Sequence, residues 1–130
     1  MNGELPGRLV WEDECCVALL TIAPIRPGHT LLIPRMEVDH WPDLPGDVAA
    51  HLMWTGQKVA CAIQAAFPCR RVGLMIAGLE VPHVHLHLVP VDVIADMDFS
   101  RQDSKALPAD LDAAAVRLKA ALAALEGAAD

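Results

Sequence analysis

The sequence is poor in basic residues and has no long uninterrupted apolar segment. Its 130 residues include 10 Lys and Arg against 17 Asp and Glu, a formal net charge of −7. A field of this sign repels phosphate backbones and anionic lipid surfaces. No stretch approaches the roughly 18 apolar residues of a membrane span, and Met1 to Glu14 lacks the apolar core of an export signal. We therefore expect a cytoplasmic protein with no nucleic-acid and no membrane partner.

Paired cysteine motifs are also missing. The four cysteines, Cys15, Cys16, Cys61 and Cys69, include a vicinal pair but no C-x-x-C. This spacing predicts neither a zinc ribbon nor a regular disulfide framework. We interpret the four as reduced, mostly buried apolar residues, and a redox role for Cys15 and Cys16 is the alternative.

The chain has the size and composition of one globular domain, residues 1–130, with 54% hydrophobic residues. Alternating and apolar patterns predict strands at 8–12, 16–21, 30–33, 72–77 and 81–91. Helical spacing predicts a long helix at 47–67 and a C-terminal helix at about 110–126, with a surface loop at about 95–108 between the last strand and that helix. This order is not the strand–helix alternation of a parallel fold, so we expect an α+β domain on an antiparallel five-stranded sheet.

Local signals set the expected ends of the two helices. Asp47 is the candidate cap of the long helix, and Pro68 cannot continue it. The C-terminal helix is rich in alanine, a strong helix former, and Gly127 is its expected end. A leucine- and alanine-rich stripe of that helix should face the core: Leu111, Ala115, Leu118, Leu122 and Leu125.

The most informative segment is Pro82-His83-Val84-His85-Leu86-His87-Leu88-Val89-Pro90. On a strand, successive side chains point to opposite faces, so His83, His85 and His87 should line one face while the apolar residues face the core. Three interpretations follow. In the first, the histidines lie on a solvated strand face. In the second, two of them chelate zinc with a third ligand such as Glu80 or Asp92. In the third, the middle imidazole attacks phosphorus while its neighbours orient it, bind the phosphoryl oxygens and protonate the leaving group.

The third interpretation agrees with a family resemblance. His83 to Val89 match the His-φ-His-φ-His-φ-φ signature, with φ apolar, of the histidine triad (HIT) superfamily. Segments of the N-terminal half also resemble that family: Gly3 to Pro6, Val10 to Asp13, Pro24, Pro27 to Leu31 and Ile33 to Arg35. The resemblance implies the HIT fold and a homodimer formed by pairing the sheets. It also implies hydrolase or nucleotidyl transferase activity at the α-phosphate of a purine nucleotide, through a nucleotidyl-histidine. Within the superfamily, the chain resembles the branch of Hint-like phosphoramidate hydrolases most.

The resemblance also implies roles for individual residues. His85 matches the nucleophile, His83 and His87 match its flanking partners, and His29 in Pro-Gly-His-Thr matches the fourth histidine of the site. The nucleotide should contact Leu19, Leu20, Thr21 and Ile22, and also Gly78, Glu80 and Val81. No metal and no other cofactor is needed for this chemistry. A zinc-binding subgroup begins with C-x-x-C, which this chain lacks, and Glu37 stands about where one of its ligand histidines would be.

Three positions depart from the family pattern. Thr21 stands where many members have an Asp or Asn that holds the ribose, and Leu79 and Glu80 replace a polar pair that contacts phosphate. Leu79 cannot donate a hydrogen bond, and an ionised Glu80 repels phosphate. Two alternatives therefore stay open: a diadenosine polyphosphate hydrolase, and a nucleotide-binding or sensing module with weak turnover.

Overall fold

The computed structural model describes residues 7–129, so the Gly3 to Pro6 segment lies outside the described residues. Five strands form one antiparallel sheet in the order β1-β2-β3-β5-β4. Their bounds are β1 Gly7–Glu12, β2 Cys16–Thr21, β3 Thr30–Pro34, β4 Arg71–Met75 and β5 Leu86–Val91. Two long helices, α1 Gly46–Ala66 and α2 Pro108–Ala129, complete the expected α+β domain. Among the described residues no helix is both long enough and apolar enough to span a bilayer.

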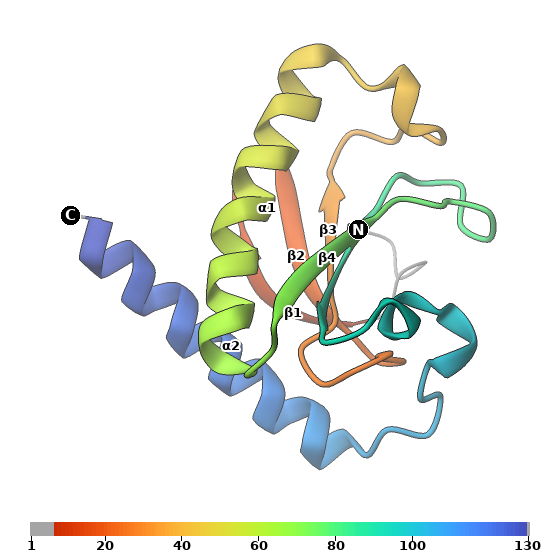
Figure 1. Cartoon of the computed structure of the whole chain (residues 1–130). Helices are drawn as coiled ribbons and strands as arrows, with labels where there is room; N and C mark the ends of the chain where they lie inside the picture. The colour runs from red at the N-terminus through yellow and green to blue at the C-terminus, as the bar shows by residue number, and fades with distance from the viewer. Residues whose placement is uncertain (1–6, 130) are drawn as a thin grey trace.

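Both long helices lie on one side of the sheet, and the turns after β5 lie on the other (Figure 1). The main core is formed where α1 and α2 pack on alternate strand residues that include Ala18, Leu20, Leu32, Leu86 and Leu88. The intervening residues point to the opposite face, where Val17, Leu19, Leu31 and Ile33 form a second, smaller cluster. The sheet is thus apolar on both faces, and its second face carries the histidines.

The last strand is shorter than expected, because β5 begins at Leu86 rather than at residue 81. Its neighbour β3 ends at Pro34, which has no N–H to extend the ladder, and Pro82 lacks one too. The backbone N–H of Val84 instead donates to the carbonyl of Val38. Of the three histidines, only His87 therefore lies in a paired strand, although Val84, Leu86 and Leu88 do point into the core as expected.

The helix ends also differ from the expected ones. Helix α1 begins at Gly46 with Pro45 as its cap residue, so Asp47 lies in the first turn rather than at the cap. Helix α2 begins at Pro108 and continues past Gly127. Proline suits the first helical position, where an N–H would have no partner, and the surrounding alanines offset the cost of one glycine.

The expected surface loop at 95–108 is partly ordered into short 3-10 helices. These are η2, Ile94–Met97, and η3, Phe99–Arg101; a third, η1, Trp41–Asp43, precedes α1. The strand expected at 72–77 runs from Arg71 to Met75, and Gly78 follows with φ of +68°.

Candidate active site

Four histidines are buried on the sheet face that does not carry the helices. His29 is fully buried, and His83, His85 and His87 are 5%, 6% and 9% exposed. Cross-strand pairing places His87 opposite Leu31 of β3 and Met75 of β4. The rings of His85 and His87 meet nearly edge to face, with centroids 4.8 Å apart. The structure thus brings together the four residues that the sequence predicts as catalytic.

The loop before β3 positions His29. Gly28 has φ of +101°, which favours glycine, and a Cβ there would lie 2.7 Å from the Phe67 ring. The Ile25 N–H donates to Nδ1 of His29 at 3.0 Å, so this nitrogen carries no proton. In the neutral ring the proton is then on Nε2, which lies 3.0 Å from Nδ1 of His87. His29 therefore donates to His87 and leaves the His87 proton on Nε2.

Backbone carbonyls fix the other two rings. Nδ1 of His85 lies 2.7 Å from the carbonyl oxygen of His83, and Nε2 of His83 lies 2.7 Å from that of Pro34. A carbonyl only accepts, so each of these nitrogens must carry a proton. Neutral His85 consequently has its lone pair on Nε2, the nitrogen to which no group of residues 7–129 forms a hydrogen bond. This is the protonation state that a nucleophilic imidazole needs.

Burial keeps two of the rings neutral. It lowers the pKa of His29 from its ordinary value of 6.5 to about 4. The pKa of His87 falls to about 3, chiefly through burial and further through its proximity to His29 and His85. At neutral pH His87 is therefore a hydrogen-bond donor through Nε2–H and not a cationic acid. This limits the sequence-based expectation that the neighbours of His85 also protonate the leaving group.

The same pKa shifts predict a loss of stability in acid. Each ring binds its proton more readily in the unfolded chain, so the contribution of these two rings to the free energy of unfolding should fall as pH drops below 6.5 and level off near pH 3. From His29 alone, the loss between pH 7.5 and pH 5 should be about 2 kcal/mol. Urea unfolding at the two pH values measures it. A His29→Leu variant should show a clearly smaller pH dependence, and an equal dependence would contradict this account.

Two residues of the segment after β5 pack against the site or hold its loop in place, and no sequence motif indicates either of them. Phe99 of η3 packs edge to face on His87, with ring centroids 4.6 Å apart. Asp96 of η2 accepts from the guanidinium groups of Arg26 and Arg101. Its pKa is lowered, first by hydrogen bonds from the backbone of residues 92 and 93 and then by Arg26. Arg26 precedes His29 in the same loop, so Asp96 connects the two segments that pack around His87.

The four residues that were expected to contact the nucleoside do not all lie on the same face of the sheet. Leu19 belongs to the cluster on the histidine face, whereas Leu20 is in the main core on the helix face. Thr21 is buried and its hydroxyl accepts from the Ala23 N–H at 3.2 Å, while Ile22 is 42% exposed. The structure therefore brings Leu19 and Thr21 to the histidine face but not Leu20.

The turn before the histidines is open to solvent. Leu79 is 94% exposed and Glu80 is also exposed, whereas Gly78 and Val81 are half-buried. The two residues that replace the family's polar pair thus point outward in this structure. A cavity of about 190 Å³ lies elsewhere, between residues 24–28, Leu20 and the start of α2, and no histidine lines it.

The cysteines are less buried than the sequence predicts. Of the four cysteines, all free, only Cys16 is buried, and Cys61 is exposed. Burial raises the pKa of the Cys16 thiol to about 12, which argues against the redox role because the thiolate is the reactive form.

Comparison with known proteins identifies the family. The model of the HIT domain matches residues 2–93. An uncharacterized HIT-like protein of Methanocaldococcus jannaschii is 31% identical over 69% of this chain and 73% of its own length. The bifunctional bis(5'-adenosyl)-triphosphatase/adenylylsulfatase of Arabidopsis thaliana is 31% identical over 65% of this chain and 50% of its own length.

A solved structure extends the likeness to the whole fold. The Zn-bound histidine triad family protein of Mycobacterium smegmatis is 28% identical, with a TM-score of 0.79 over 97% of this chain and 91% of that one. Together with the buried histidine row and the five-stranded sheet, these matches show that the chain belongs to the histidine triad (HIT) family.

Proposed function

We propose that the protein hydrolyses a purine nucleotide derivative at its α-phosphorus, with a phosphoramidate as the substrate type and His85 as the nucleophile. The observation that carries the proposal is the hydrogen bond from Nδ1 of His85 to the His83 carbonyl. It leaves the Nε2 lone pair free to form the N–P bond while the P–N bond of the phosphoramidate breaks and the amine departs with a proton taken from water. The ring then becomes cationic, and its Nδ1–H donates more strongly to the carbonyl.

His87 supplies the second element of the proposed mechanism. Its Nε2–H, fixed by His29, donates to a phosphoryl oxygen and stabilises the charge that develops in the transition state. Water then cleaves the nucleotidyl-histidine and releases the nucleoside monophosphate. Because His85 is only 6% exposed, substrate entry requires movement of a bordering segment, and the exposed turn around Leu79 and Glu80 is our candidate.

A substrate panel tests the reaction class. Incubation with adenosine phosphoramidate should release AMP faster than incubation with a diadenosine polyphosphate or an adenylyl sulfate. The Arabidopsis thaliana relative named for triphosphatase and adenylylsulfatase activities makes the latter two the natural comparators. Faster cleavage of the diadenosine compound would favour the polyphosphate hydrolase. Binding of AMP with no turnover of any compound would favour the sensing module and reject the proposed hydrolase.

The proposal includes a homodimer in which β4 pairs with β4 of a second copy. In the part of the chain that the structure describes, β4 pairs with β5 on one side and ends the strand order, so its other edge is open to a further strand. Leu74 on this strand is 40% exposed. Sedimentation at micromolar concentration should give twice the chain mass, and Leu74→Lys should shift it toward the monomer because a charge disfavours edge pairing. A monomeric wild-type protein would contradict this arrangement.

A further inference from the structure

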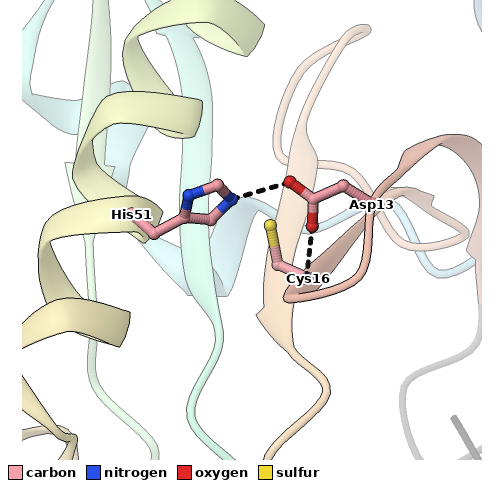
Figure 2. Close-up of side chains that lie close together, drawn as sticks. All are labelled: Asp13, Cys16 and His51. Atoms are coloured by element: carbon pink, nitrogen blue, oxygen red, sulfur yellow. Dashed lines mark hydrogen bonds and ion pairs between the residues drawn. The ribbon is translucent and has the colours of Figure 1, made fainter.

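A second cluster of metal-ligating side chains lies away from the histidine row. Asp13 in the turn between β1 and β2, Cys16 at the start of β2 and His51 in α1 converge, as Figure 2 shows. Their potential ligand atoms all lie within 4.8 Å of one another. Nε2 of His51 and Oδ2 of Asp13 are 2.7 Å apart. Cys16 belongs to the core on the helix face of the sheet, so this cluster and the histidine row are on opposite faces.

The geometry of Asp13 is already fixed without any ion. Its Oδ1 accepts from the N–H groups of Cys15 at 2.7 Å and Cys16 at 2.8 Å. These two bonds orient the carboxylate so that Oδ2 faces His51. A ligand held by a supporting hydrogen bond in this way loses little freedom when it binds a metal.

Thr55 provides a second, independent observation. It lies one helical turn after His51 and is fully buried. Its hydroxyl approaches the Cys16 thiol, yet this oxygen has no hydrogen-bond partner among the described residues. A buried hydroxyl without a partner costs stability. A ligand at the cluster would give this oxygen a partner.

We propose that Asp13, Cys16 and His51 bind one divalent transition-metal ion of the Zn²⁺ type, with water or the Thr55 hydroxyl as the fourth ligand. Thiolate, imidazole and carboxylate are the donors that Zn²⁺ takes. Ideal tetrahedral bonds place neighbouring ligand atoms about 3.3 to 3.5 Å apart. The Asp13 and His51 atoms must therefore separate by less than about 1 Å from their present 2.7 Å. On binding, the Cys16 thiol loses its proton to the buffer and the S–metal bond forms.

The sequence spacing gave no indication of this site. The ligands lie at positions 13, 16 and 51, which is not a paired-cysteine pattern, and only the fold brings the α1 histidine to the turn after β1. The cluster also differs from the C-x-x-C arrangement of the family's zinc-binding subgroup. A metal ion bound there would connect α1 to the β1–β2 turn. It would therefore stabilise the fold and take no part in the chemistry at phosphate.

Metal binding by the full-length reduced protein tests the proposal. After dialysis against Zn²⁺ and then buffer, elemental analysis should find one ion per chain. Titration with Cd²⁺ should produce thiolate–metal charge-transfer absorption that saturates at one equivalent. Cys16→Ser should abolish that absorption, and His51→Gln should weaken affinity at least about tenfold. Zn²⁺ should also raise the melting temperature of the wild type.

Matched variants make the result decisive. Cys61→Ser and His40→Gln change exposed residues outside the cluster, and both should bind the ion as the wild type does. His51 is half-buried, so His51→Gln should fold even where Cys16→Ser does not, and circular dichroism checks this. Absence of bound ion in the wild type would overturn the proposal. So would wild-type affinity in His51→Gln, which would assign the ion to other groups such as the triad.

Discussion

Replacement of His85 by alanine is expected to reduce turnover of adenosine phosphoramidate by about 10³-fold or more. The reason is that the Nε2 lone pair of His85 forms the N–P bond, and no other group of the site is held in the same protonation state. His83 has its Nε2 engaged with the Pro34 carbonyl, and His87 has its Nδ1 engaged with His29. Steady-state release of AMP measures the effect on kcat.

The substitution should leave the fold intact. His85 lies before β5 and outside its ladder, so its loss removes no cross-strand backbone hydrogen bond. A matched change at the exposed His40 should leave kcat unchanged. If His85→Ala folds and keeps more than about a tenth of wild-type kcat, the account of covalent catalysis by this residue is wrong.

Replacement of His29 by leucine should give the second largest effect, a fall in kcat of about 10²-fold with a smaller change in KM. His29 touches no phosphate in this proposal and acts as a positioning residue, because its Nε2–H fixes the tautomer of His87. Loss of a tautomer-fixing partner has effects of this size or larger in other enzymes. The variant also leaves the Ile25 N–H without its acceptor, which should cost about 1 to 3 kcal/mol of stability.

Nitrogen NMR of the His87 ring separates this role from a merely structural one. In the wild type the spectrum should show the proton on Nε2, and in His29→Leu it should show a mixture of both tautomers. A variant that loses kcat while His87 keeps a single Nε2–H tautomer would contradict the positioning role. Unchanged kcat in a stable variant would contradict it as well.

Much of the fold could be predicted because the patterns that specify it are local. The apolar run over 16–21 predicts β2 with the observed bounds, and the apolar stripe of the C-terminal helix includes the buried Leu111, Leu118 and Leu122. The shortened β5 could not be predicted from periodicity. The start of β5 depends on its pairing with β3, which ends at Pro34 because proline has no N–H to donate. Periodicity within one segment does not show the pairing between two segments that are distant in sequence.

The sequence predicts the histidines of the candidate site but not the residues that pack against them. The spacing of His83, His85 and His87 identifies them, whereas the contact between Phe99 and His87 arises from the path of the chain after β5. The pairing of His51 with Asp13 joins residues 38 positions apart, with no motif to indicate it. The nucleotide-binding roles of the seven residues named for them stay predictions: Leu19, Leu20, Thr21, Ile22, Gly78, Glu80 and Val81.

Trapping of the covalent intermediate tests the central claim most directly. The wild-type protein is mixed with labelled adenosine phosphoramidate, quenched within one turnover at alkaline pH, digested, and analysed by mass spectrometry. We predict an adenylyl group on the peptide that contains residues 83–87, attached to His85 and absent from His85→Ala. Label on another histidine, or AMP release in a burst with no labelled peptide, would contradict the account.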